Sequence, residues 1–105
     1  MLPSRLDNFI RLLNELTDMT GACRFELNDS VQNKHRYYEI SVYKDLMDKW
    51  VVKCTWGRIG TNLGSSNSSQ TYDKSALIAE IALHLSKRFK RGYQYVEGNG
   101  VFQSL

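Results

Sequence analysis

The residues with the clearest chemical potential form a short run, Trp56-Gly57-Arg58, which follows a strand-like segment and precedes a glycine-containing loop. An indole can stack on a sugar or a base, and a neighbouring guanidinium can pair with a phosphate. Gly57 is expected to let the backbone turn out of the strand and present the indole. The alternation of apolar residues over 50–56 also allows a second interpretation, in which Trp56 is a core residue like Trp50.

A second group of polar residues falls at the end of a predicted helix. At about 100° per residue, His84, Lys87, Arg88 and Arg91 lie on one line that is rotated away from the apolar stripe, so we expect them in solvent. The segment 74–91 as a whole holds five Lys or Arg residues and a single Glu, an excess that permits an anionic partner. Taken alone, these cations are explained as well by their favourable interaction with the helix dipole.

The sequence contains no recognisable catalytic or metal-binding constellation. Its two cysteines form no C-x-x-C pair, they show no zinc spacing with the two histidines, and no phosphate-binding glycine loop is present. A nucleophilic pair of Cys54 and His84 is disfavoured, because the strand pattern places Cys54 toward the core, where a thiol is inert. We therefore predict a protein that is not an enzyme and has no cofactor or metal, with Cys23 and Cys54 as reduced core residues.

Length and composition place the chain among small intracellular domains. It has 105 residues, 42% of them hydrophobic, and a formal net charge of +3. A chain of this size forms one domain, and no apolar run approaches the roughly 18 residues that a membrane-spanning helix needs. Charged residues at regular intervals in the first twenty positions also exclude a secretory signal sequence.

Periodicity predicts an α+β fold, with a mainly antiparallel sheet and one long helix packed on one face of it. Apolar residues lie on both faces of the predicted strands. We therefore expect an amphipathic amino-terminal helix to dock on the sheet or on another copy of the protein. The predicted elements are a helix at about 5–18, strands at 23–27, 36–44 and 50–56, a serine-rich edge strand at 65–72, a helix from Asp73 to Gly92, a strand at 93–96 and a tail over 98–105.

Several of these segments together resemble the WGR domain, a family named for its Trp-Gly-Arg motif. The resemblance covers about residues 22–97, after an amino-terminal extension of 1–21. It rests on "KWVVKCTWGRIG", on the preceding strand "RYYEISVYKD", on "ACRFELN", and on a helix that ends in "KRFKRGYQYV". The sequence departs from many relatives after Gly64, where Ser65 stands in place of a glutamine.

The resemblance implies a non-catalytic nucleic-acid-binding role. In the DNA-damage-responsive poly(ADP-ribose) polymerases, the motif's tryptophan packs on the terminal nucleotide of a DNA strand and its arginine lies close by, roles that fall here on Trp56 and Arg58. Asn33 lies in the loop where some relatives place a DNA-contacting asparagine. Lys87, Arg88 and Arg91 would extend the positive surface.

The same resemblance implies a biological setting and leaves one alternative open. No transferase domain fits in the remaining residues, so the chain resembles a stand-alone WGR protein of the bacterial or phage kind, in the cytoplasm or at the nucleoid. DNA is favoured over RNA as the partner. The alternative is a protein-interaction adaptor that uses the same exposed tryptophan and arginine, since both residue types commonly anchor protein interfaces.

Overall fold

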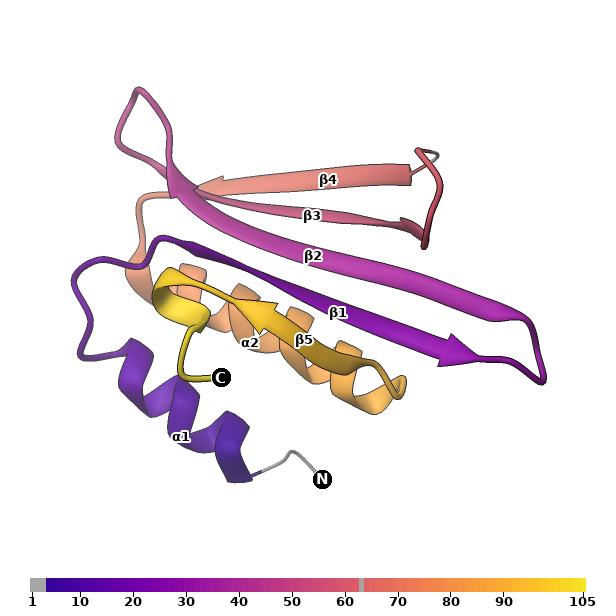
Figure 1. Ribbon diagram of the computed structural model, residues 1–105. Coiled ribbons are helices and arrows are strands. Elements are labelled where there is room, and N and C mark those ends of the chain that lie inside the picture. The colour runs from indigo at the N-terminus through magenta and orange to yellow at the C-terminus, as the bar shows by residue number, and fades with distance from the viewer. Residues whose placement is uncertain (1–3, 63) are drawn as a thin grey trace.

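The computed structural model describes residues 4–62 and 64–105. Five antiparallel strands form one sheet in the order β4-β3-β2-β1-β5, and two helices pack against one face of it (Figure 1), so the predicted α+β fold is confirmed. The elements are α1 (Ser4–Leu13), β1 (Gly21–Asp29), β2 (Lys34–Lys44), β3 (Trp50–Arg58), β4 (Gly64–Thr71), α2 (Lys74–Lys90), β5 (Gln94–Gly98) and the short 3-10 helix η1 (Gly100–Phe102).

The strands turn one face toward the helices, as their alternation predicts. Tyr38, Ile40 and Val42 of β2 are buried on this face, beside Val52 and Cys54 of β3. The third strand, however, does not end at Trp56. It continues in register to its last residue, with Gly57 paired to Tyr37 on one side and to Gly64 on the other. The expectation that Gly57 turns the chain out of the strand is therefore wrong, and Trp56 is presented by a regular strand.

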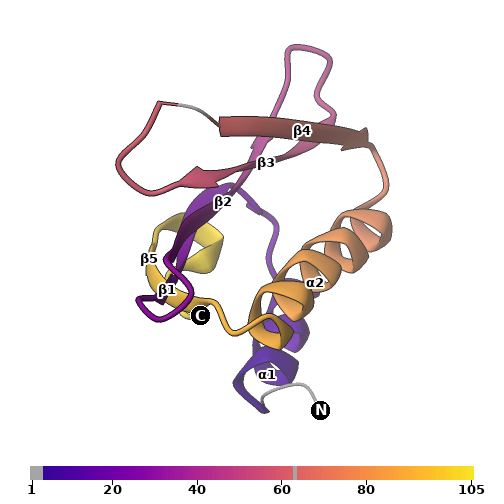
Figure 2. The same ribbon diagram turned by 90° about the vertical axis from the view of Figure 1, so that its right-hand side faces the viewer.

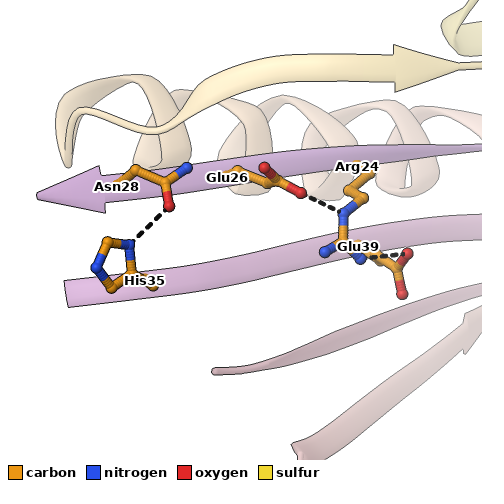
Figure 3. Close-up of polar contacts among 5 residues, drawn as sticks. All are labelled: Arg24, Glu26, Asn28, His35 and Glu39. Atoms are coloured by element: carbon orange, nitrogen blue, oxygen red, sulfur yellow. Dashed lines mark hydrogen bonds and ion pairs between the residues drawn. The ribbon is translucent and has the colours of Figure 1, made fainter. Parts of the chain in front are cut away.

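The opposite face of the sheet carries a row of polar pairs (Figure 3). Arg24 of β1 pairs with Glu26 through Nε at 2.9 Å and with Glu39 of β2 through Nη1 at 3.2 Å. Nearby, His35 Nδ1 lies 2.9 Å from Asn28 Oδ1. Because these groups satisfy one another and Arg24 also stacks over the Tyr37 ring, this face needs no helix to cover it.

The first helix joins α2 on the core side of the sheet (Figure 1), where its Leu6, Phe9 and Leu13 share one core with buried strand residues. It therefore docks within the domain, as expected, but on the face that α2 also covers. It ends at Leu13, earlier than predicted, where the side-chain amide of Asn14 donates to the carbonyl of Ile10 at 3.1 Å. The ammonium of Lys74, at the start of α2, donates to the carbonyls of Asn14 and Leu16 and so satisfies acceptors that follow the helix end.

Three of the last eight residues belong to the core, although the sequence predicts a tail there. Val101 and Leu105 are buried and Phe102 is inaccessible to solvent. The Phe102 ring stacks on that of Phe9 in α1, with centroids 6.1 Å apart. Gly100 makes this close return possible, because its φ of 55° is left-handed and a Cβ there would stand 2.2 Å from the Thr20 carbonyl oxygen.

Helix α2 has the ends that the sequence predicts. The Asp73 side chain accepts a hydrogen bond from the Ser75 amide at 3.0 Å, as an N-cap does. At the other end Gly92 adopts a φ of 82°, the Gly92 amide bonds to the Phe89 carbonyl, and the Tyr93 amide bonds to the Arg88 carbonyl. This is a Schellman motif, and it fixes Tyr93 beside Arg88.

The serine-rich segment forms the predicted edge strand, β4, which Figure 2 shows at the margin of the sheet above α2. Within the described residues, neither helix combines the length and the apolar character that crossing a bilayer demands.

Candidate nucleic-acid interface

A cleft of about 590 Å³ is lined by residues from the start of β2, the end of β3 and the end of α2. These three element ends lie toward the right of Figure 1. The lining of the cleft combines aromatic rings with cations, and among the described residues that line it there is no Asp or Glu. The aromatic members are Tyr37, Tyr38, Trp56 and Tyr93, the cations are Lys34, Arg36, Arg58, Arg88 and Arg91, and Asn33 and Gly57 complete the lining.

Trp56 lies at the rim of this cleft with its indole stacked on Tyr38. The two residues face each other across β2 and β3, and their rings lie 6.0 Å apart at an interplanar angle of 14°. Tyr38 is buried, whereas Trp56 remains 37% exposed. Trp56 is therefore neither a fully buried core residue nor a fully exposed one, because it packs on the core through Tyr38 and keeps part of its indole at the surface. Its role as a platform for a nucleotide stays a prediction.

Arg88 forms the floor of the cleft and is only 6% exposed. Our expectation that it lies in solvent is wrong. Its spacing from Ile81 and Leu85 places it on the buried stripe of α2. The guanidinium carbon lies 3.9 Å from the Tyr38 ring centroid and 4.8 Å from that of Tyr93. Its Nε is buried and has no hydrogen-bond partner among the described residues. Arg88 therefore brings to the cleft lining a largely buried cation whose donors are not all satisfied.

Arg58 is exposed and is held by Asn33. Its Nη1 donates to the Asn33 carbonyl and its Nη2 to the Asn33 side-chain oxygen, both at 3.2 Å. Asn33 can offer both acceptors because it adopts a left-handed φ of 52° in the turn between β1 and β2. The structure therefore brings these two predicted site residues together, with Asn33 positioning the guanidinium.

Of the other residues predicted for the site, Gly57 and Arg91 line the cleft and Lys87 does not. Sequence reasoning missed Lys34, Arg36 and the three tyrosines. Arg36 stands directly opposite Arg58 across the two strands. Because Arg36 lies two residues before Tyr38, strand alternation places both residues on the same face of β2, and this could have been read from the sequence. That Arg36 pairs with Arg58 follows only from the register of the two strands.

A polar network supports Tyr38 from behind. The Tyr38 hydroxyl lies 3.4 Å from His84 Nδ1, and His84 Nε2 lies 3.5 Å from Glu80 Oε1, to which the Ser69 hydroxyl also donates. His84 is therefore partnered and half-buried. Burial raises the pKa of the Tyr38 hydroxyl and that of the neighbouring Cys54 thiol, so both groups stay neutral at physiological pH. Cys54 thus lacks the depressed pKa of a catalytic thiol.

Comparisons with known proteins agree with this architecture. The chain is 33% identical to poly [ADP-ribose] polymerase 1 of Caenorhabditis elegans over 63 residues, and this alignment covers 59% of the chain and 7% of that protein. It is 44% identical to a poly [ADP-ribose] polymerase of Drosophila melanogaster over 41 residues, and this alignment covers 38% of the chain and 4% of that protein. Both relatives are animal proteins, and neither supports the bacterial or phage setting that the resemblance implied.

The chain thus spans less than a tenth of the length of these two relatives. The family model of the WGR domain matches residues 21–100, which include every strand of the sheet, the long helix and all residues that line the cleft. The chain therefore belongs to the WGR domain family.

Proposed function

We propose that this protein is a non-catalytic nucleic-acid-binding module that holds the end or break of a DNA strand in the cleft. The Trp56 indole stacks on a sugar or base of the terminal nucleotide. Arg58 meets the adjacent phosphate, and Arg36, Arg88 and Arg91 extend the positive surface along the strand.

The observation that carries this proposal is the composition of the cleft. Five cationic side chains line it without an Asp or Glu among the described residues there. One of the five, Arg88, is buried and keeps an unpaired Nε. Burying a guanidinium without an anion is costly, and a phosphate in the cleft would offset that cost. Rings beside the cations suit a ligand that has flat bases as well as phosphates.

Membership of the family supports the same proposal, because the WGR domain is a non-catalytic module associated with nucleic-acid binding. The alternative, a protein adaptor that uses the same surface, would also rely on tryptophan, tyrosine and arginine, which are common at protein interfaces. The salt dependence of binding separates the two functions, because phosphate contacts make affinity fall steeply with salt.

A binding assay with fluorescent oligonucleotides tests the proposal. Single-stranded, blunt and nicked DNA, closed dumbbell DNA without ends, and RNA of the same sequence are compared at two salt concentrations. We expect ends and nicks to bind more tightly than the closed dumbbell, and affinity to fall steeply from the lower to the higher salt concentration. Equal affinity for dumbbell and nicked DNA would exclude recognition of ends, and a flat salt dependence would favour the adaptor alternative.

Two variants separate stacking from phosphate contact. Trp56→Ala should weaken binding by ~1–3 kcal/mol with little change in the salt slope, and Arg58→Ala should weaken it and flatten the slope by about one unit. Matched controls are Tyr72→Ala, an exposed aromatic outside the cleft, and Lys53→Ala, a cation on the other face of β3. Unfolding of Trp56→Ala together with unchanged binding by Arg58→Ala would contradict the proposal.

A further inference from the structure

The edge strand β4 carries a feature that the cleft does not explain. It pairs with β3 on one side, and in the described part of the chain no strand pairs with its other side. In Figures 1 and 2 it forms the margin of the sheet. Its backbone N–H and C=O groups on that side are therefore free to pair with another strand.

Native proteins usually protect such an edge with a charged residue, a proline, a bulge or a very short strand. Residues 64–71, "GSSNSSQT", contain no charge and no proline, and their register with β3 is continuous over eight residue pairs. The opposite edge of the sheet differs. Strand β5 has only five residues, it includes Glu97, and its register with β1 shifts beside Arg24. Only one edge is thus open to pairing.

The side chains of β4 suggest which strand would pair with it. Residues 65–69 read Ser-Ser-Asn-Ser-Ser, the same in both directions. An antiparallel copy centred on Asn67 places serine opposite serine, Asn67 opposite itself and Gly64 opposite Gln70. None of these pairs involves like charges, and opposed hydroxyl and amide groups can form cross-strand hydrogen bonds.

We propose that β4 pairs antiparallel with the β4 of a second copy of this chain, centred on Asn67, so that two sheets become continuous. The proposed pairing covers residues 64–70 and ends before Thr71. Beyond it, the Tyr72 hydroxyl donates a hydrogen bond to the Met47 carbonyl of the β2–β3 turn. A single pair of strands buries little area, so the dimer is weak and reversible. The two-fold axis is perpendicular to the sheet, and both Trp56 residues therefore lie on the same side of the dimer.

Charge pairs on the outward face test this register. Ser66 and Ser68 lie on the face away from the core, opposite Thr55 and Lys53 of β3. In the dimer Ser66 of one copy faces Ser68 of the other. The double variant Ser66→Glu/Ser68→Glu sets like charges opposite each other twice, whereas Ser66→Lys/Ser68→Glu sets opposite charges there. Both variants carry the same Glu beside Lys53, so they differ only at residue 66.

Sedimentation equilibrium without nucleic acid measures the dissociation constant of the dimer. Protein concentrations up to about 1 mM allow dimers with a Kd in that range to be detected. We expect the Lys/Glu variant to dimerise about fivefold more tightly than the wild type, and the Glu/Glu variant about fivefold more weakly. Amides of β4 should show hydrogen-exchange protection that rises with protein concentration. A monomeric wild type at every concentration, or equal Kd values for the two folded variants, would overturn the proposal. Neither outcome depends on the function proposed for the cleft.

Discussion

Arg88 combines an unfavourable burial of charge with a position in the candidate site. It is a cation with 6% of its surface exposed, and its guanidinium lies over two tyrosine rings. Attraction to the rings compensates part of the lost hydration, and the Nε donor is left over. A residue of this kind stabilises the folded chain less than an apolar one would, and under the proposed function its charge would attract a phosphate.

Replacing Arg88 should therefore separate stability from binding. Arg88→Met keeps the length and apolar packing of the side chain while removing the buried charge, so we expect an unchanged or higher Tm and weaker binding of DNA. Thermal unfolding and fluorescence anisotropy give the two readouts. Lys87→Met, an exposed neighbour outside the cleft, is the control. A large drop in Tm for Arg88→Met would mean that the guanidinium has a structural role.

Asn33 offers a second test at the scale of one residue, because its backbone and its side chain both hold Arg58. Asn33→Gly keeps the left-handed backbone and removes only the side-chain acceptor, whereas Asn33→Ala also strains the turn. We expect Asn33→Gly to weaken DNA binding several-fold at unchanged Tm, and Asn33→Ala to lower the Tm as well. If Asn33→Gly bound DNA like the wild type, the Asn33 side chain would not position Arg58.

At the scale of the element, the end of α2 connects secondary structure to the site. The Schellman motif bonds the Tyr93 amide to the Arg88 carbonyl, so the backbone turn that ends the helix also sets the ring beside the guanidinium. The strand pair β2–β3 supplies the other half, because its register stacks Trp56 on Tyr38. The cleft is therefore built on regular elements and a defined helix end.

The packing of the chain ends against one another gives a prediction for these elements. Phe102 is fully buried against Phe9, so Phe102→Ala should destabilise the fold by about 3–5 kcal/mol, through lost burial and the cavity it leaves. Urea unfolding measures the change. Val96→Ala, in β5 and 50% exposed, should cost far less. Similar losses in the two variants would show that residues 99–105 contribute little to the core.

The strands and the ends of the long helix can be predicted from the sequence, because they are determined by residues that are close together along the chain. Alternation indicates the three central strands, and Asp73 and Gly92 mark the ends of the long helix. The early end of α1 and the burial of Val101, Phe102 and Leu105 depend on contacts between distant segments, such as Lys74 with Leu16 and Phe102 with Phe9. Such contacts leave no periodic signal in the sequence.

Some residues of the candidate site can also be predicted from the sequence, whereas others depend on contacts between distant segments. Trp56, Arg58 and Asn33 can be proposed from the motif and from family resemblance. The meeting of Arg36 with Arg58 needs the strand register, and the burial of Arg88 needs the packing of α2 against Tyr38. A helix projection alone cannot tell a cation at the edge of the apolar stripe from one in solvent.

At the scale of the whole molecule, buried titratable groups link stability to pH. Burial raises the pKa of the Cys23 thiol from 9.0 to about 12, and it raises the pKa of Cys54 and Tyr38 in the same direction. Each of these groups is neutral in the folded state and ionises more readily once unfolded. Their contribution to stability is therefore complete below pH 9 and is lost as the pH rises toward 12.

We accordingly expect the free energy of unfolding to change little between pH 7 and pH 8.5 and to fall above pH 9, where the unfolded thiols begin to ionise. Urea titrations followed by tryptophan fluorescence measure it. In Cys23→Ala the fall between pH 9 and 12 should be shallower, when each protein is compared with its own value at pH 7. An identical slope in the two proteins would show that Cys23 is not the source.

The burial of both cysteines also has a practical consequence for solution studies. Cys23 and Cys54 are 4% and 3% exposed, so the native protein presents no reactive thiol on its described surface. A cysteine placed at Leu46, a fully exposed residue of the β2–β3 turn, would be the one fast-labelling position. It lies at the opposite end of β2 and β3 from the cleft. A dye there could report distances to a labelled oligonucleotide without removing either native cysteine.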